Sequence, residues 1–575
     1  MRVPFRTGTR TAVIVGLEPG AREDLATIAA LVDPVPALPP PLLALTRWVA
    51  EETACAWGEA VFRALPPGAG AGAPAALPAW PPPAPAGAAR LVTGRARAAA
   101  VEAAVAAALG AGQRALLLAP EIEQARGWAA RLQARLGEAA TLVTGAAPAR
   151  ARWTAWWGLA QGQGRLAVGT RGAAWLPIAP LGVTVVVDEE DPAHKAPDSP
   201  RWHAREVALE RRRREGGGIL LTSGAPSLES WVRARGGALA GAPAGGEAWP
   251  AVERVSLAGA PLDRCLSPGL RDAARAALAR GGAVLLVLNR LGFAPVLVCA
   301  ECGAVRRCER CRVALLYSRE ERQLACRLCG ARVRAASLCG RCRGRRLEPL
   351  GWGTERVEAE ARRLFPEARV LRYDSTRAPA EAAAIRAAFR RGEARVLVGT
   401  HMALRLLEDA AVAVGALLLA DVTLNVPDFR AAERTFQLAW RLAEGVAPDG
   451  AVWLQSFWPD HPALLAVAAG DPERFYAAEW RERQELGYPP ARRMARLLAE
   501  GPEAARMAQD LAARAQKTPA TVLGPAALAG HRAQVVLLGG SELPAIVAEL
   551  LAPARGRRRL AGTRLAVDVD PVELP

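Results

Sequence analysis

Four Cys-x-x-Cys pairs within residues 299–342 constrain this chain more than any other feature. The pairs are Cys299/Cys302, Cys308/Cys311, Cys326/Cys329 and Cys339/Cys342. A Cys-x-x-Cys turn lets one Zn²⁺ take both sulfurs at about 2.3 Å, and two such pairs complete a tetrahedron. The spacing therefore predicts two zinc ions in closed Cys₄ sites, which are structural because no coordination position is left for water. Gly303, Gly330 and Gly340 directly follow cysteines and are expected to relieve the tight turns.

Spacing alone leaves open which pairs share an ion. A nested arrangement is favoured, with the outer pairs together and the inner pairs together, because residues 313–329 form two apolar-patterned arms around a charged turn. Several nearby arginines fit either phosphate contacts or a solvated basic face. They include Arg306, Arg307, Arg310 and Arg312.

Short apolar runs separated by helical patterns predict an α/β fold. Continuous runs of this kind are typical of parallel strands that are buried on both faces of a sheet. Two blocks of runs predict two α/β lobes, the second interrupted by the cysteines. The runs lie at 114–120, 165–170, 183–190 and 218–224, then at 283–290, 394–400, 416–422 and 451–456. Residues 501–575 mix strand and helix patterns, as a small α+β domain would.

The N-terminal part is predicted to contain a strand at 10–18 and helices within 39–65. Residues 66–90 are rich in Pro, Ala and Gly and have no periodic pattern. We interpret them as an extended, unpacked linker, with an ordered loop along a domain surface as the alternative. A length of 575 residues fits three to five domains of roughly 150 residues each.

A formal net charge of +17 predicts a polyanionic partner, for which nucleic acid is the first candidate. Arginine dominates this charge, since lysine occurs only at Lys195 and Lys517. No apolar run is long enough to span a membrane, and the N-terminus lacks the apolar core of a secretory signal. We therefore expect a cytoplasmic, nucleoid-associated protein with no membrane partner. In that compartment its ten cysteines favour metal binding over disulfides.

Several longer strings resemble the PriA family of bacterial replication restart proteins, also called primosomal protein N′. Around the cysteines these are NRLGFAPVLVCAECG, GTERVEAEARRLFPEARVLRYDSTR, LNVPDFRAAERTFQL and QSFWPDHPAL. The first lobe carries VVVDEED, PRWHAREVALERR and SGAPSLES. LPPPLLALTRWVAEETACAWGEA resembles the end of the family's N-terminal domain, and RLAVDVDP resembles its C-terminal domain. The resemblance covers most of the chain.

The resemblance implies two RecA-like helicase lobes with an inserted two-zinc module, a small N-terminal DNA-binding domain and a C-terminal α+β domain. It places zinc 1 on Cys299, Cys302, Cys339 and Cys342, and zinc 2 on Cys308, Cys311, Cys326 and Cys329. The expected domains are 1–67 (N-terminal, DNA-binding), 68–90 (linker), 91–245 (first lobe), 246–298 with 343–500 (second lobe), 299–342 (zinc module) and 501–575 (C-terminal).

The resemblance fails where the family binds ATP. A P-loop reads G-x-x-G-x-G-K-[ST], and its backbone N–H groups, lysine and hydroxyl hold the phosphates and Mg²⁺. The aligned stretch is LVTGRARA, in which Gly94 remains, Arg97 replaces the lysine and Ala98 replaces the hydroxyl. A planar guanidinium does not substitute for a compact ammonium. Neither lysine of the chain lies in a glycine-rich turn, so we expect no other P-loop.

The other motor elements depart in the same direction. The acidic strand end keeps Asp188 and Glu189 but has Asp191 where the family has His, and its carboxylates fit Mg²⁺ coordination and a helix N-cap equally well. The arginine-finger motif reads RLAEGVAP, with Gly445 and Pro448 at the arginine positions. Loss of one finger lowers turnover by about 10³–10⁵. We therefore expect no catalytic residues and no use of ATP or Mg²⁺.

Two departures concern DNA binding. The 66–90 stretch stands where the family has a winged helix, and the family's first strand, part of the pocket for a DNA 3′ end, is missing. Either the start codon lies upstream or the pocket is incomplete. Trp202 sits where the family has an aromatic-rich loop that touches single-stranded DNA, and is the predicted DNA contact. The spacing of Trp153, Trp156 and Trp157 predicts the buried stripe of a helix.

Together these features predict a non-catalytic scaffold that binds stalled or branched replication forks and promotes reloading of the replicative helicase. The resemblance implies three kinds of partner: forked, branched and single-stranded DNA, single-strand DNA-binding protein, and primosome or helicase-loading proteins. The alternative is an active ATP-dependent 3′–5′ DNA helicase with an unorthodox nucleotide site. A zinc-ribbon protein acting on RNA or in transcription would explain the zinc and the charge but not the order of the two-lobe motifs.

Overall fold

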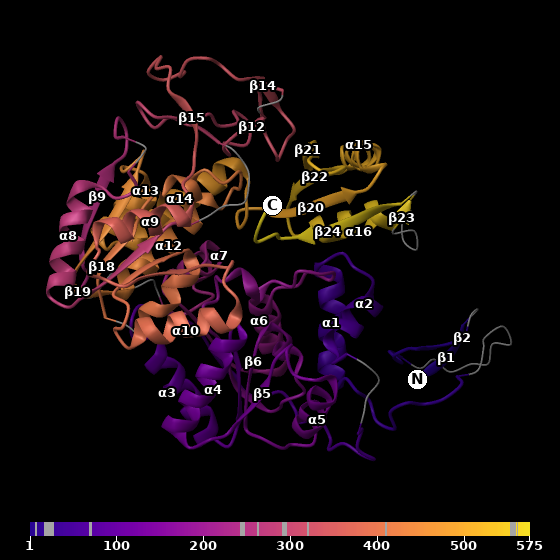
Figure 1. Ribbon diagram of the computed structural model, residues 1–575. Helices are drawn as coiled ribbons and strands as arrows, with labels where there is room; N and C mark the ends of the chain where they lie inside the picture. Colours follow the sequence, from indigo (N-terminus) through magenta and orange to yellow (C-terminus); the bar gives the residue numbers. More distant parts are fainter. Residues whose placement is uncertain are drawn as a thin grey trace.

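The computed structural model describes residues 1–5, 8–16, 28–67, 72–241, 248–261, 264–289, 296–318, 321–408, 411–552, 559–560 and 562–574. Two six-stranded parallel sheets and a five-stranded antiparallel sheet are the main sheets of the molecule, with the cysteine module above them (Figure 1). No helix within the described ranges is long and apolar enough to cross a membrane.

The first parallel sheet, with its helices, is lobe 1. Its strands are β3 (Ala86–Thr93), β4 (Arg114–Leu118), β5 (Ala140–Val143), β6 (Leu166–Gly169), β7 (Leu181–Val186) and β8 (Gly217–Ser223), in the order β3-β8-β7-β4-β6-β5. Its helices are α3 (Arg97–Gly110), α4 (Ile122–Leu136), α5 (Ala149–Ala160), η1 (Arg171–Trp175), η2 (Pro192–His194), α6 (Ala204–Glu215) and α7 (Leu228–Arg235). Every residue of β4 is buried, as expected of a strand covered on both faces. The tryptophans of α5 are buried as predicted.

The second parallel sheet belongs to lobe 2. Its strands are β9 (Ala251–Ser256), β10 (Ala283–Val287), β16 (Val370–Tyr373), β17 (Val396–Gly399), β18 (Val412–Leu417) and β19 (Val446–Ser456), in the order β16-β17-β10-β18-β19-β9. Its helices are α8 (Pro268–Ala279), α9 (Thr354–Leu364), α10 (Pro379–Arg390), η3 (His401–Glu408), α11 (Asp421–Leu424), α12 (Ala431–Gly445), α13 (Pro462–Ala469) and α14 (Pro472–Leu486). The two α/β lobes predicted from the sequence are therefore confirmed, each built on a parallel sheet.

The cysteine module is inserted between β10 and α9 of lobe 2. It contains β11 (Leu297–Cys299), β12 (Leu316–Ser318), β13 (Gln323–Ala325), β14 (Arg332–Arg334) and β15 (Leu347–Pro349). Antiparallel pairing of β12 with β13 confirms the predicted hairpin between the inner cysteine pairs. Pairing of β11 with β15 closes the base of the module and brings the outer cysteine pairs together.

The terminal domains lie on the same side of the two lobes, where α1 contacts α16 (Figure 1). The N-terminal elements are β1 (Arg2–Phe5), β2 (Gly8–Thr11), α1 (Pro40–Glu52) and α2 (Trp57–Ala64). The C-terminal elements are β20 (Arg493–Glu500), α15 (Ala504–Ala515), β21 (Thr521–Leu528), β22 (Arg532–Gly539), α16 (Leu543–Leu551), β23 (Arg559–Leu560) and β24 (Thr563–Val569). One face of this sheet packs on α15 and α16, and the opposite face packs on the cysteine module.

Several predicted boundaries differ from the structure. The predicted linker overlaps β3, because Ala84, Pro85 and the residues after them hydrogen-bond beside β8. Ala73 and Leu77 pack on the lobe 1 core, so the described part of the 66–90 stretch is the ordered loop that stood as the alternative. Residues 68–71, and the boundary expected at residue 245, lie outside the described residues.

Strand assignments shift at three further places. The strand expected at 10–18 ends at Thr11, and residues 17–18 lie outside the described part. The run at 416–422 is strand only to Leu417, because α11 begins at Asp421. β20 precedes the predicted start of the C-terminal domain at residue 501, yet pairs with β22 and β24 of that sheet. Apolar runs predicted these strands without showing which sheet each one joins.

Candidate functional site

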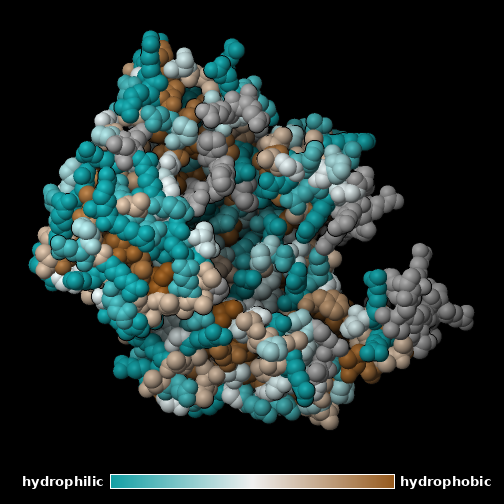
Figure 2. Space-filling model, in the orientation of Figure 1, coloured by the Kyte–Doolittle hydropathy of each residue, from teal (hydrophilic) through white to brown (hydrophobic). Residues whose placement is uncertain are grey.

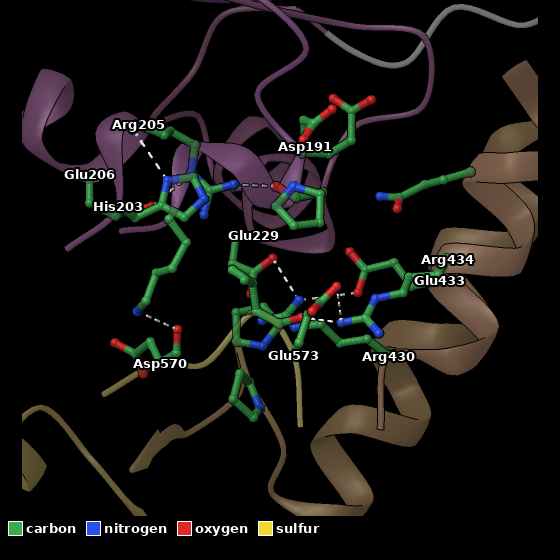
Figure 3. Close-up of a pocket in the computed structure, with 18 of the residues that line it drawn as sticks. Asp191, His203, Arg205, Glu206, Glu229, Arg430, Glu433, Arg434, Asp570 and Glu573 are labelled. Carbon is green, nitrogen blue, oxygen red and sulfur yellow. Dashed lines mark hydrogen bonds and ion pairs between the residues drawn. The ribbon is translucent and has the colours of Figure 1, made fainter. Parts of the chain in front are cut away.

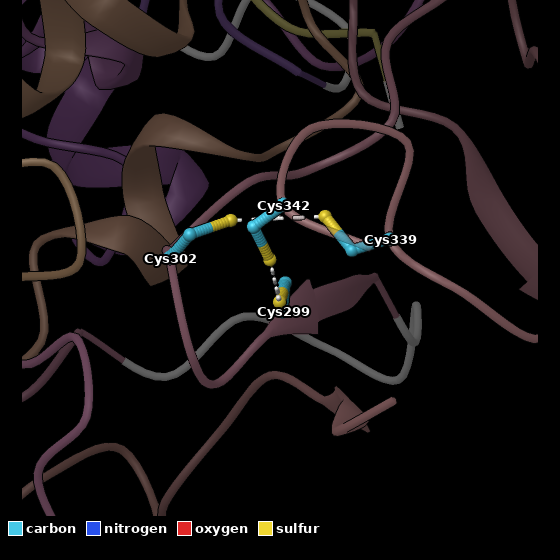
Figure 4. Close-up of side chains that lie close together, drawn as sticks. All are labelled: Cys299, Cys302, Cys339 and Cys342. Carbon is cyan, nitrogen blue, oxygen red and sulfur yellow. Dashed lines mark hydrogen bonds between the residues drawn. The ribbon is translucent and has the colours of Figure 1, made fainter. Parts of the chain in front are cut away.

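The eight cysteines form two quartets with the nested membership that the family resemblance implies. Within each quartet the ligand sulfurs lie within 4.8 Å of one another. Figure 4 shows the outer quartet, whose four sulfurs point toward a common centre. The quartets are Cys299, Cys302, Cys339 and Cys342, and Cys308, Cys311, Cys326 and Cys329.

The sulfur geometry fits a tetrahedral metal ion and excludes disulfides. The Sγ atoms are 3.6 Å apart in Cys299–Cys342 and 3.7 Å apart in Cys308–Cys329. A Zn–S bond of about 2.3 Å separates the sulfurs of a tetrahedron by about 3.8 Å, whereas a disulfide needs about 2.0 Å. Each quartet could therefore hold one metal ion, with four thiolate ligands and no open position.

The same backbone turn builds all four knuckles. In each, the residue four positions after the first cysteine has a positive φ and donates its N–H to that cysteine's carbonyl. These residues are Gly303, Arg312, Gly330 and Arg343, with N···O distances of 2.7, 2.8, 3.0 and 3.0 Å. The expectation for Gly340 is therefore wrong, since the left-handed position of that knuckle is Arg343. A side chain in this conformation costs about 1–2 kcal/mol, which a metal-ligand bond easily offsets.

The two quartets have different surroundings. Cys308, Cys311 and Cys326 are buried in an apolar cluster with Met494 and Val536 of the C-terminal sheet. A hydrogen bond from the Cys311 thiol lowers the pKa of Cys326 to about 5. In the outer quartet, Cys342 is exposed. The inner quartet thus connects the module to the C-terminal domain, while the outer quartet closes the module's own base.

The degenerate P-loop keeps the strand–turn–helix path but not an open phosphate cradle. Gly94 follows β3 with φ of +76°, and α3 begins at Arg97. The Arg97 guanidinium donates to the Gly94 carbonyl and to Glu444 Oε1 of lobe 2, both at 2.8 Å. Arg95 donates to the carbonyls of Glu444 and Val446 at 3.1 and 3.3 Å. Arginine side chains from the turn therefore reach across to lobe 2.

The acidic residues after β7 are all engaged within the protein. Asp188 accepts a hydrogen bond from Gln124 at 3.0 Å and lies 3.6 Å from the Arg441 guanidinium of lobe 2. Glu189, which is fully buried, accepts from Arg205 at 2.6 Å. Asp191 caps the short helix η2 by accepting from the Ala193 N–H. The sequence left two roles open for these carboxylates, Mg²⁺ coordination and helix capping. The structure shows the capping role for Asp191.

The arginine-finger positions cannot supply fingers. Gly445 is the last residue of α12, and a Cβ placed there would lie 2.5 Å from the Leu407 Cβ. Pro448 lies within β19. The contacts with lobe 1 are made by Arg441 and Glu444. Both residues belong to the same motif, and the sequence analysis did not single them out. The available signal was a pair of compensating replacements, Arg97 in one lobe and Glu444 in the other.

A cavity of about 760 Å³ lies where both lobes and both terminal domains meet. Figure 2 shows a hollow in the middle of the molecule with a largely hydrophilic lining. Nine carboxylates of the lining stand beside nine arginines and one lysine. In Figure 3, Arg430 lies between Glu229 and Glu433, to which it is paired. Because its charges are balanced, the cavity alone does not account for the basic character of the chain.

Trp202 lines this cavity but is only 7% exposed. Its ring meets Trp175 edge-on at 5.4 Å between centroids. The neighbouring Lys195 is also buried, because its Nζ donates to the carbonyls of Val569 and Asp570 at 2.6 and 2.9 Å. The loop that carries Trp202 is thus tied to the C-terminal domain, and the role of Trp202 in binding single strands stays a prediction.

Excess positive charge gathers beside the cavity in what we name the arginine cluster, which sequence reasoning missed. Its members are Arg201 of lobe 1, Arg327 of the cysteine module, and Arg496 and Arg532 of the C-terminal domain. Burial, together with the charges of the other three, lowers the pKa of Arg496 to about 10, although Asp568 opposes this. Gln534 joins the parts by accepting from Arg496 at 2.6 Å and donating to the Arg327 carbonyl at 2.9 Å.

The arginines near the cysteines, for which two readings stood open, mostly make contacts between domains. Arg307 donates to Asn425 of lobe 2 at 3.0 Å. Arg310 donates to the Val522 carbonyl of the C-terminal sheet at 2.8 Å. Arg312 pairs with Glu485 at 3.3 Å. These side chains therefore dock the module onto its neighbours.

Two protein-family models match the N-terminal and C-terminal regions of the chain. The family model described as "3'DNA-binding domain (3'BD)" matches residues 1–66, and the model described as "Primosomal protein N C-terminal domain" matches residues 484–572. A replication restart protein PriA from Treponema pallidum is 30% identical over 84% of this chain and 76% of its own length. One from Bacillus subtilis is 29% identical over 72% of this chain and 53% of its own length.

Further relatives agree in name but extend beyond this chain. A probable replication restart protein PriA from Deinococcus radiodurans is 32% identical over 84% of this chain and 54% of its own length. The chain thus spans about half to three quarters of the length of these curated relatives. Among solved structures, the DUF1998 helicase MrfA bound to DNA and AMPPNP aligns with a TM-score of 0.38 and 12% identity over 68% of this chain and 48% of that one.

Proposed function

We propose a function from one premise: the chain belongs to the PriA family of replication restart proteins. It binds stalled or branched DNA forks and promotes reloading of the replicative helicase without unwinding DNA itself. Its partners are the fork DNA, single-strand DNA-binding protein and the proteins that load the replicative helicase. It works in the cytoplasm, at the nucleoid.

The state of the nucleotide site carries this proposal. A phosphate cradle needs backbone N–H groups, a lysine and a Mg²⁺ ligand that are open to the ligand. Here the Arg97 guanidinium bonds to the turn's own carbonyl, and Asp188 faces Arg441. Gly445 and Pro448 contribute no guanidinium at the finger positions. ATP and Mg²⁺ are therefore not used.

Zinc is the ion proposed for both quartets. Four thiolates in a closed tetrahedron are the usual structural site of Zn²⁺, and softness favours it over Mg²⁺ or Ca²⁺. The ions hold residues 299–342 in one shape, and that shape positions Arg327 beside the C-terminal sheet. Metal binding thus supports the arginine cluster, which we assign to DNA contact, and takes no part in chemistry.

Fork binding and ATP turnover, measured on one zinc-loaded sample, test the proposal. We expect tight binding of a forked DNA and no DNA-stimulated ATP hydrolysis above background. The affinity should fall steeply with salt, because binding rests on phosphate contacts. Turnover above background that disappears in Asp188→Asn would establish the alternative, an active helicase with an unorthodox nucleotide site.

The arginine cluster yields a second expectation. The double variant Arg327→Gln/Arg532→Gln should weaken fork binding and lower the salt slope by about one for each phosphate that is no longer neutralised. A salt titration followed by fluorescence anisotropy measures both quantities. Arg506→Gln is the matched control, because Arg506 is 87% exposed on α15, which covers the opposite face of the C-terminal sheet. Equal losses of fork affinity in the control and the double variant would show a nonspecific charge effect. They would contradict the assignment of the arginine cluster to DNA contact.

A further inference from the structure

Among the residues that the structure describes, three sets of ion pairs cross the cleft in which a two-lobed motor holds its nucleotide. The first is Arg97 of lobe 1 with Glu444 of lobe 2, at 2.8 Å, with side chains 22% and 8% exposed. Both residues stand at motor-motif positions, Arg97 at the P-loop lysine and Glu444 within the finger motif. The Glu444 carboxylate also lies against Gly224, at the end of β8, where an added Cβ would meet its Oε2 at 2.7 Å.

The second set joins Arg441 of lobe 2 to the acidic strand end of lobe 1. Its guanidinium pairs with Glu190 and lies 3.6 Å from Asp188. Burial lowers the pKa of Arg441, but Glu190, Asp188 and Asp191 more than offset this, so the pKa is raised above its ordinary value and the residue stays charged. A permanent cation thus occupies the place beside Asp188 where a motor protein would bind Mg²⁺.

The third set joins η3 of lobe 2 to lobe 1. Arg405 pairs with Glu121, which follows β4, and lies 3.6 Å from Asp191. The contacts of Arg97, Arg405 and Arg441 therefore fall at the carboxyl ends of β3, β4 and β7, across the edge where open α/β sheets bind ligands. Each pair joins one lobe to the other, and none lies within a single lobe.

Apolar packing supports the closed arrangement. Helix α7 of lobe 1 contributes Leu228 and Trp231 to the main core cluster of lobe 2. Trp231 stacks on Tyr476 at 5.7 Å between ring centroids, and the Tyr476 hydroxyl donates to the Pro226 carbonyl at 2.6 Å. The lobes therefore share an apolar core in addition to the ion pairs.

We propose that the pairs Arg97–Glu444, Arg441–Asp188/Glu190 and Arg405–Glu121 form an interlobe latch that holds the two lobes closed without nucleotide. In motors of this fold, the phosphates and Mg²⁺ bring groups of both lobes together, and hydrolysis releases them. Here the chain's own side chains join the lobes, so closure does not wait for nucleotide. The lobes then act as one rigid platform for the terminal domains. The inference rests on the proposed absence of nucleotide use, but concerns the shape of the protein rather than its turnover.

Charge reversal and charge swapping test the latch. Arg97→Glu and Glu444→Arg each bring two like charges together across the cleft, so each should raise the open population at least about tenfold. The swap Arg97→Glu/Glu444→Arg restores opposite charges and should restore closure. Arg126→Glu is the control, because Arg126 pairs with Glu123 within α4 and both are more than half exposed.

Interlobe energy transfer measures closure in the full-length, zinc-loaded protein. Dyes on noncanonical amino acids at Gln133 of α4 and Ala384 of α10 spare the cysteines, and both positions are exposed. High transfer without nucleotide in the parent, low transfer in both single variants and recovery in the swap support the latch. Unchanged transfer in the single variants, or no recovery in the swap, overturns it. ATP turnover of the same samples reports separately on the proposed function.

Discussion

Repairing the P-loop of this chain should leave ATP turnover at background. The triple variant Ala96→Gly/Arg97→Lys/Ala98→Thr restores the last glycine, the lysine and the Mg²⁺ hydroxyl of the family motif, since Ala96 stands at its last glycine position. It does not restore the arginine fingers, whose loss lowers turnover by about 10³–10⁵. Steady-state ATP hydrolysis with saturating forked DNA measures the outcome.

The fold explains why the fingers cannot be restored by substitution alone. An arginine at position 445 would start from a Cβ only 2.5 Å from that of Leu407, so η3 would have to move. The second finger position, Pro448, lies within strand β19, which begins at Val446. Turnover above background in the triple variant, lost again on adding Asp188→Asn, would show that the restored site hydrolyses ATP without arginine fingers and would refute this account.

Removing the inner metal ion should be the most damaging single lesion. In Cys326→Ser one zinc per chain is lost, and structural zinc stabilises small folded modules by about 10–16 kcal/mol. Because Cys308, Cys311 and Cys326 pack against Met494 and Val536, the C-terminal sheet should loosen as well. Elemental analysis measures the zinc content, and amide hydrogen exchange across β22 measures the loosening.

The outer quartet provides the comparison. Cys342→Ser should also lose one zinc but leave exchange in β22 near that of the parent, because Cys342 is exposed and its quartet lies apart from the C-terminal cluster. Cys55→Ser, at a half-buried thiol outside both quartets, should retain two zinc ions. Chelation that removes both ions but leaves the module folded and DNA binding unchanged would contradict the structural role.

Local sequence signals predicted the features that depend on local geometry. The Cys-x-x-Cys spacing predicted two four-cysteine sites, the family resemblance supplied their membership, and the apolar runs predicted most strands of the lobes. The hairpin between the inner pairs was readable because β12 and β13 are adjacent in sequence. Residues 313–329 carry both of its arms within a few residues of each other.

Features that depend on partners distant in the chain were missed. Arg97 and Glu444 are separated by 347 positions, and no local pattern joins them. The same holds for the arginine cluster, whose members come from lobe 1, the cysteine module and the C-terminal domain. Position 340 was misassigned for another reason: the knuckle turn requires a left-handed residue four positions after its first cysteine, and Arg343 occupies that position.

The burial of Lys195 has a practical consequence. Its amine is enclosed by the carbonyls of Val569 and Asp570 and by Asp568, whereas Lys517, the other lysine, is exposed. An acylating reagent should therefore modify Lys517 readily and reach Lys195 only when the C-terminal domain lifts away from lobe 1. The extent of Lys195 acylation therefore reports that movement. Mass spectrometry can measure it without any dye or label introduced into the chain.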